Sequence, residues 1–228
     1  TGAAMAASLF GLGRIHGVTR PAIAVTLPTV EKPIILIDGG ANSDATAQML
    51  KQFAIMGATY SKHVLEIENP RVGVMNIGEE VEKGNPLAKE AHKLLEEDSE
   101  NINFVGNIEG KEIFLSKCDV VVCDGFVGNV ALKVTEGASS MLFYLLKQEL
   151  KSDILGMLIG FLAKPFMKRV YKRINYEEFG GCLLLGVRGI SVIAHGRSRA
   201  YAIKNAVRVA NEAVQRGVNS KISEFIEG

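Results

Sequence analysis

Tryptophan is absent from this 228-residue sequence, and cysteine occurs only at Cys118, Cys123 and Cys182. The odd number and the wide gap before Cys182 argue against a disulfide framework, and neither a CxxC pair nor a Cys/His metal spacing is present. We therefore expect a reducing, cytoplasmic environment and no metal site. Cys118 and Cys123 are interpreted as packing residues rather than nucleophiles.

Charge of one sign is not in excess either, because 26 Lys and Arg residues face 25 Asp and Glu residues, a formal net charge of +1. This balance gives no sign of nucleic-acid binding, so any basic surface must be local. No apolar run reaches the roughly 18 to 20 residues of a bilayer-spanning helix, and no signal peptide is visible. Because the chain opens on Thr1-Gly2 rather than methionine, we expect that an N-terminal part of the natural protein is missing.

What is present is an alternation of apolar runs and helical patterns. Short runs bounded by Pro and Gly predict strands at Ala22–Leu27, Pro33–Ile37, Arg71–Met75, Asn103–Val105, Cys118–Cys123 and Gly189–Ala194. Apolar spacings of three and four predict helices at Thr1–Leu12, Ala45–Leu65, Leu87–Leu95, Gly128–Leu150 and Ala200–Arg216. Asp44 is the expected N-cap of the second helix, and Gly217 suits the end of the last. The alternation favours a single α/β domain over residues 1–228, with three α/β/α layers and a mostly parallel sheet.

Glycine-bearing loops follow four of these strands and begin at Asp38, Asn76, Asp124 and His195. Ligands of open parallel sheets bind outside the carboxyl ends of the strands, so these loops are expected to meet at one edge. Three of them lead toward a helix, whose N-terminus favours phosphate. One such loop alone is more often an ordinary turn. Four loops at one edge, each with a possible acid, base or donor, favour an anion site.

Two residues near this edge have open interpretations. Asn129, Lys133 and Glu136 share one helical face, so Lys133 either holds an anion or forms a solvated ion pair with Glu136. His195 ends an apolar strand and is either a proton-transfer group or a structural histidine. The run Gly11–Gly17 superficially suggests a dinucleotide fingerprint, but its spacing is wrong and it follows a helix.

Residues 151–178 break the alternation and are expected to form a helical insertion without a strand. Apolar residues spaced by four lie about 200° around the helix from lysines spaced by four, and Pro165 should kink or split the helix. Such faces suit an anionic membrane surface or an acidic protein partner. The alternative is a dimer-packing or core helix with a solvated lysine face. The expected contact residues are Leu158, Leu162, Phe166, Lys164, Lys168, Arg169 and Lys172.

Several motifs together resemble the phosphate acyltransferase family of bacterial phospholipid synthesis. They are Pro21–Pro28, Gln52–Gly57, Glu68–Arg71, Asn76–Glu80, Lys83–Asn85, Asp119–Asn129 and His195-Gly196. The segments Asn-Ile-Gly-Glu-Glu and Asp-Gly-Phe-Val-Gly-Asn make the resemblance specific. Members of that family are longer at the N-terminus, where Thr1-Gly2 would fall in a Gly-Asn-Thr-Gly turn. Gly39 and the pair Cys182-Leu183 depart from the Val and the Ala-Pro that the family pattern leads us to expect.

The resemblance implies a fold like that of the isopropylmalate dehydrogenase and phosphotransacetylase group. It also implies a homodimer that associates peripherally with the membrane and needs no cofactor. The substrates would be a long-chain acyl carrier protein and inorganic phosphate. The product would be an acyl phosphate, which a downstream glycerol-phosphate acyltransferase would use for phosphatidic acid and phospholipid synthesis.

The resemblance and the loops together give a set of expected site residues. For catalysis we expect Asn129, His195, Lys133 and Asp124. For substrate and phosphate binding we expect Thr1, Gly2, Asp38, Asn42, Asn76, Gly78, Glu79, Lys83, Asn85, Gly128 and Ser198. Lys83 and Lys133 would hold phosphate, Asn129 or His195 would stabilise the oxyanion or protonate the thiolate, and Asp124 and Glu79 would orient these donors. No serine has the setting of a nucleophile elbow.

Three rival functions are weighed against this one. A phosphotransacetylase-like enzyme using acyl-CoA would suit the same edge, but it leaves the apolar and basic insertion without a purpose. A metal-dependent decarboxylating dehydrogenase needs clustered aspartates and a nucleotide site, and the sequence supplies neither. A non-catalytic, membrane-associated scaffold for lipid enzymes would use residues 151–178 alone.

Overall fold

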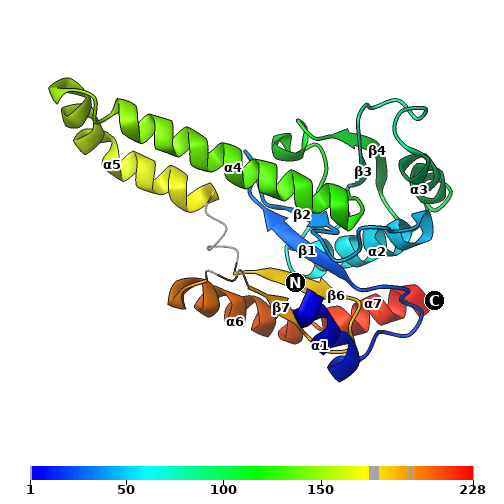
Figure 1. Ribbon diagram of the computed structural model, residues 1–228. Coiled ribbons are helices and arrows are strands. Elements are labelled where there is room, and N and C mark those ends of the chain that lie inside the picture. Colours follow the sequence, from blue (N-terminus) through cyan, green and yellow to red (C-terminus); the bar gives the residue numbers. More distant parts are fainter. Residues whose placement is uncertain (1, 175–179, 195, 197, 228) are drawn as a thin grey trace.

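A computed structural model describes residues 2–174, 180–194, 196 and 198–227. Its centre is a seven-stranded sheet with the strand order β4-β3-β5-β2-β1-β6-β7 (Figure 1). The strands are β1 (Ala22–Leu27), β2 (Ile34–Ile37), β3 (Val72–Asn76), β4 (Phe104–Glu109), β5 (Val120–Val122), β6 (Cys182–Leu185) and β7 (Val192–Ile193). The helices are α1 (Gly2–Leu12), α2 (Ala47–His63), α3 (Pro86–Glu96), α4 (Gly125–Glu149), α5 (Ile154–Ile174), α6 (Ala200–Gln215) and α7 (Val218–Glu227), with a short 3-10 helix, η1 (Ile113–Leu115).

The sheet is mixed, with a parallel half and an antiparallel half. β4, β3, β5 and β2 are parallel neighbours. β1 lies antiparallel between β2 and β6, and β7 is antiparallel to β6. β6 therefore runs in the direction of β2, and only β1 and β7 oppose the other strands. The prediction of a mostly parallel sheet is confirmed, although it did not include the opposed strands.

Helices cover both faces of the sheet, which confirms the three-layer prediction. Phe53 and Met56 of α2 pack on one face against Ile35 and Ile37, together with residues of α3, α6 and α7. Leu36 points to the other face, which η1 and the beginning of α4 cover through Ile113, Val127 and Leu132. This alternation is the period-two pattern of a strand. Val120–Val122 is buried throughout, as expected of a strand between two helical layers.

Polar caps fix where the helices begin. Thr46, not Asp44, caps α2, because its side chain accepts a hydrogen bond from the Met49 N–H over 3.3 Å. Asn85 caps α3 by accepting from the Ala88 N–H over 2.8 Å, and Pro86 occupies the first turn. α4 begins at Gly125, three residues before the predicted Gly128, with Asp124 as its cap.

Two elements near the C-terminus are absent from the sequence prediction. The first is β6, which the run Cys182–Leu185 forms between β1 and β7. The strand expected at Gly189–Ala194 was predicted but is shorter, covering Val192–Ile193. Gly217 has a φ of +61° and ends α6 as predicted. The second unpredicted element is α7, which follows directly and whose Val218 and Ile222 are buried in the core.

The long α4 and α5 form an antiparallel arm that extends away from the sheet (Figure 1). Phe143 and Tyr171 join the two helices through an edge-to-face contact, with ring centroids 5.7 Å apart. Pro165 lies inside α5, so it does not split the helix, which was one of the two outcomes expected for it. The insertion is helical without a strand as far as Ile174, and residues 175–178 lie outside the described part. Among the described residues, no helix has both the length and the apolar character needed to cross a bilayer.

Candidate functional site

Three of the four predicted loops meet at one edge of the sheet. β3, β5 and β2 are parallel neighbours, with Val74 and Ile37 both paired to Val122. Extending the pairing of Val74 with Val122 by two residues along β3 and β5 places Asn76 opposite Asp124. Two backbone hydrogen bonds join the loops after β2 and β5: Asp38 N to Cys123 O at 3.0 Å and Gly125 N to Asn42 O at 2.7 Å. The loops that begin at Asp38, Asn76 and Asp124 therefore lie at the same edge of the sheet, and the first and third are bonded to each other.

The strand before the fourth loop points to the opposite edge. Val192 pairs with Leu183, which lies at the level of Ala24 and Ile37. β7 then runs against β2, so Ala194 lies toward the edge where β2 begins. The expectation that this strand ends beside the other three was wrong, because it assumed that every strand is parallel. His195 and Thr1 lie outside the described residues, and Ser198 is half-buried just before α6.

Asp38 shapes the loop that it begins. Its side chain is fully buried. Its carboxylate accepts hydrogen bonds at 2.7 to 3.1 Å from the backbone N–H groups of Ile23, Gly40, Ala41 and Asn42 and from the Asn42 side chain. The Asn42 amide also donates to the Pro21 carbonyl over 2.8 Å. The Asp38 carboxylate and the Asn42 NH₂ group thus make their hydrogen bonds within the protein.

The beginning of α4 lies against this loop. Asp124 accepts from the N–H groups of Phe126 and Val127, each over 2.9 Å. The Gly125 N–H donates to Asn42, and the Gly128 N–H donates to the Asp124 carbonyl. The first four N–H groups of the helix are therefore all bonded internally. What remains available to an anion is the field of a 25-residue helix and nearby side chains.

Close backbone contact explains two glycines here. A Cβ at Gly128 would overlap the Asp38 carbonyl oxygen, so this position admits no larger residue without movement. Gly40 has a φ of +132°, and its missing side chain leaves room for Asn129. Asn129 is exposed in the first turns of α4, where its amide is available to a ligand.

The loop after β3 is held by its own asparagine. Asn76 donates to the Lys83 carbonyl over 3.1 Å and accepts from the Ile77 N–H over 2.8 Å. Gly84 has a φ of +91°, and a Cβ there would overlap the Asn76 side chain. Lys83 is exposed, Gly78 is buried against it, and the Asn85 side chain is committed to capping α3.

An ion-pair cluster holds the outside of the same loop. Lys117 contacts Glu79 at 2.6 Å and Glu112 at 2.8 Å. Hydrogen bonds to Glu112 and then Glu79 raise the pKa of Lys117, and Lys117 is the main cause of the lowered pKa of Glu112. The Glu79 carboxylate is therefore bonded to Lys117 and is not a free group of the site.

Lys133 lies on the other side of the site from Lys83. Lys133 pairs with Glu136 at 2.8 Å, and both side chains are about half exposed. The charges of Lys133 and Glu136 affect the pKa of Cys182 in β6. Lys83 follows β3, and β5, β2 and β1 lie between β3 and β6 in the sheet. Burial and then Glu136 raise the pKa of Cys182 to about 11. Burial likewise raises the pKa of Cys118 to about 12 and that of Cys123 well above its usual value, which fits packing residues.

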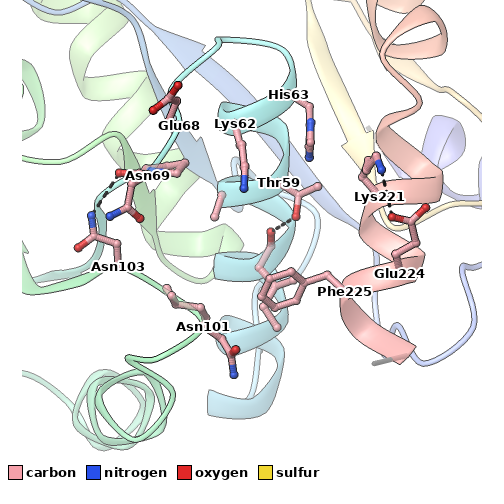
Figure 2. Close-up of a pocket in the computed structure, with 14 residues that line it drawn as sticks. Thr59, Lys62, His63, Glu68, Asn69, Asn101, Asn103, Lys221, Glu224 and Phe225 are labelled. Atoms are coloured by element: carbon pink, nitrogen blue, oxygen red, sulfur yellow. Dashed lines mark hydrogen bonds and ion pairs between the residues drawn. The ribbon is translucent and has the colours of Figure 1, made fainter.

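A groove among the described residues lies elsewhere. It has a volume of about 310 Å³ and is formed by α2, α7 and the loops before β3 and β4 (Figure 2). Thr59, Lys62 and His63 line it from α2, and Lys221 and Phe225 from α7. These loops precede strands, so the groove is at the edge opposite the site loops. None of the predicted site residues lines it.

Sequence reasoning missed two buried residues beneath the Asn76 loop. His92 of α3 and Asn107 of β4 are 5% and 3% exposed and share a hydrogen bond of 3.0 Å. Asn107 also donates to the Glu80 carbonyl over 2.9 Å. The available signal was a histidine on the apolar face of α3 and an asparagine within an apolar strand.

Comparison with known proteins agrees with this architecture. The model of a family described as "Fatty acid synthesis protein" matches residues 1–221. The phosphate acyltransferase of Halothermothrix orenii is 53% identical over 226 residues, which cover 99% of this chain and 68% of that protein. The phosphate acyltransferase of Heliobacterium modesticaldum is 52% identical over 228 residues, which cover 100% and 68%.

A solved structure shows the same fold. The crystal structure of a phosphotransacetylase from Streptococcus pyogenes aligns with a TM-score of 0.53 and 16% sequence identity, covering 97% of this chain and 58% of that one. This likeness confirms the predicted fold class. Given the family match and the two relatives, the chain belongs to the phosphate acyltransferase family and is an acyltransferase.

Proposed function

We propose that this protein transfers a long-chain fatty acyl group from acyl carrier protein to inorganic phosphate, and that the acyl phosphate serves phospholipid synthesis. Acyl transfer to phosphate follows from the family. The donor and the pathway are the proposal. The observation that supports it is the convergence of the Asp38, Asn76 and Asp124 loops at one edge, with Lys83 and Asn129 exposed there.

The reaction needs charge and position more than a protein nucleophile. A phosphate oxygen attacks the thioester carbonyl, the tetrahedral oxyanion collapses, the C–S bond breaks and the thiolate takes a proton. Lys83 and Lys133 supply positive charge on two sides of the edge, and the α4 field adds to it. Asn129 stabilises the oxyanion through its amide NH₂ group, and the thiolate takes its proton from solvent. Asp124 and Glu79 act indirectly, through the helix and loop that they hold.

Lys133 is available to an anion despite its ion pair. An exposed pair three residues apart on a helix contributes only about 0.5 kcal/mol, so a phosphate dianion can replace Glu136 as its partner. We expect Lys133→Ala to lower phosphate-dependent turnover roughly tenfold without changing the unfolding temperature. Lys147→Ala, at an exposed position of the same helix, is the control. Unchanged kinetics would remove Lys133 from the site.

The function itself is tested by measuring acyl phosphate directly. The purified protein, with any residues that naturally precede Thr1, is supplied with phosphate and either acyl carrier protein or coenzyme A carrying the same acyl chain. We expect phosphate-dependent product with acyl carrier protein as the better donor. A preference for the coenzyme A thioester would favour the phosphotransacetylase-like alternative. Membrane binding without any acyl phosphate would favour the scaffold alternative.

We also propose that the arm mediates contacts with other molecules. α5 has no buried residue, and Leu158, Leu162 and Phe166 are each more than half exposed. Lys164, Lys168 and Lys172 are spaced by four residues along the same helix, and Arg169 lies over the Phe166 ring at 4.8 Å. These features support a homodimer associated peripherally with the cytoplasmic membrane surface. We propose in addition that a downstream glycerol-phosphate acyltransferase uses the product.

A further inference from the structure

Asn107 connects the core to the Asn76 loop through a fixed set of bonds. Its Nδ2 donates to the Glu80 carbonyl over 2.9 Å and lies 3.4 Å from the Glu79 carbonyl. Its Oδ1 lies 3.0 Å from Nδ1 of His92. The His92 ring is held edge-to-face on Phe104, with centroids 5.0 Å apart. The loop is thus joined to α3 and β4 from below.

The chemistry of an amide fixes the direction of these bonds. Carbonyl oxygens only accept, so the NH₂ group of Asn107 must face Glu79 and Glu80. Oδ1 then faces His92, and Nδ1 of His92 must carry a proton. Turning the amide over would set Oδ1 against two carbonyl oxygens, which accept and cannot donate, so that all three oxygens would lack this hydrogen bond. The pair therefore holds one arrangement of the loop.

The loop has three attachments of unequal exposure. Asn76 holds the Lys83 carbonyl, Lys117 holds the Glu79 carboxylate, and Asn107 holds the backbone between them. The side chains of the Lys117–Glu79 pair are 38% and 60% exposed, whereas Asn107 is 3% exposed. A hydrogen bond in a low-dielectric interior restrains a loop more than an exposed ion pair does.

We propose that Asn107, oriented by His92, is a positioning residue that sets residues 77–84 for phosphate binding. The proposal rests on the proposed function, which assigns Lys83 of this loop to phosphate. Neither Asn107 nor His92 needs to touch the substrate. Their effect reaches it through the Glu79 and Glu80 carbonyls, and small displacements of binding groups lower rates strongly.

The direct test is Asn107→Asp in the enzyme with its complete natural chain. Aspartate keeps nearly the same size and an acceptor for His92, but it replaces the NH₂ donor with an oxygen. We expect KM for phosphate to rise roughly tenfold or more, with KM for the acyl donor changed less than about twofold. Amide hydrogen exchange in residues 77–84 should also become faster. Lys117→Met, which removes the exposed attachment to Glu79 together with the Glu112 pair, should change KM for phosphate less than about threefold.

A second pair of variants separates positioning from packing. His92→Asn places an N–H near the position of Nδ1 and should therefore keep KM for phosphate close to that of the wild-type protein. His92→Leu fills the apolar site without a donor, so it should raise KM for phosphate even where the unfolding temperature is unchanged. Equal behaviour of the two variants would assign His92 to packing alone and overturn its role.

The outcomes also distinguish this inference from the proposed function. A folded Asn107→Asp protein with unchanged KM for phosphate and unchanged exchange would overturn the positioning role. If the wild-type protein forms no acyl phosphate, the proposed function fails. Faster exchange in residues 77–84 of Asn107→Asp would then still support the role of Asn107 in holding the loop. Should Asn107→Asp fail to fold, the two His92 variants decide the question.

Discussion

The loop edge and the arm differ in where their side chains find partners. At the loop edge, Asp38, Asn76 and Asp124 are buried, and each hydrogen-bonds to backbone within the protein. In the arm, α5 has no buried residue, and its apolar side chains face solvent. The contrast indicates that the loop edge is shaped by this chain's own contacts. The arm carries apolar surface that another molecule or surface would have to bury.

The largest effect is expected from removing the centre of the loop edge. Asp38→Ala takes the acceptor away from the four backbone N–H groups of Ile23, Gly40, Ala41 and Asn42. Buried donors without partners should lower the free energy of unfolding by roughly 3 kcal/mol or more. Denaturant titration measures this, with the exposed Asp44→Ala as the matched control, expected within about 0.5 kcal/mol of wild type. Equal stability of the two variants would show that the Asp38 bonds do not hold the loop.

A smaller loss is expected from crowding the same place. Gly128→Ala introduces a Cβ against the Asp38 carbonyl and should cost about 1–3 kcal/mol of stability. Gly137→Ala, in the same helix, meets no atom within 4 Å and should instead stabilise by up to about 1 kcal/mol. Thermal unfolding of the two variants measures the difference. A shift of the same sign in both would contradict the close contact at Gly128.

The smallest effect on stability is expected in the arm. Replacing Leu158, Leu162 and Phe166 by serine should each change the free energy of unfolding by less than about 0.5 kcal/mol. The same variants should weaken self-association or binding to vesicles that contain anionic lipid, because they remove apolar surface. Thermal unfolding, sedimentation and vesicle pelleting separate these effects. A loss of stability as large as that from Gly128→Ala would mean that these side chains are packed within the fold.

Local sequence patterns were sufficient for the parallel half of the sheet and its loops. The buried runs Ile34–Ile37 and Val120–Val122 and the glycines that follow them indicate both the strands and the edge where they end. β6 could not be recognised in the same way. Its four residues are distinguished only by pairing with β1, about 160 residues earlier in the chain, and by pairing with β7. Because β6 was not predicted, the antiparallel direction of β7 was not predicted either.

Predicting the individual site residues was limited by bonds that a sequence does not display. The sequence singled out Asp38, but it could not show that the Asp38 carboxylate accepts a hydrogen bond from the N–H of Ile23, a residue 15 positions away. The beginning of α4 offers a helix field rather than free N–H groups, because Asp124 and Asn42 already bind them. Asn107 and His92 belong to no sequence motif, and their hydrogen bond forms only because the fold brings α3 and β4 together.

The central claim is that phosphate binds at the edge where β2, β3 and β5 end. A crystal structure with bound tungstate, a heavy analogue of phosphate, tests it most directly. We predict the anion between the loops that begin at Asn76 and Asp124, in contact with the ammonium group of Lys83 or Lys133. An anion bound instead in the groove between α2 and α7 (Figure 2), with the loop edge empty, would contradict the account.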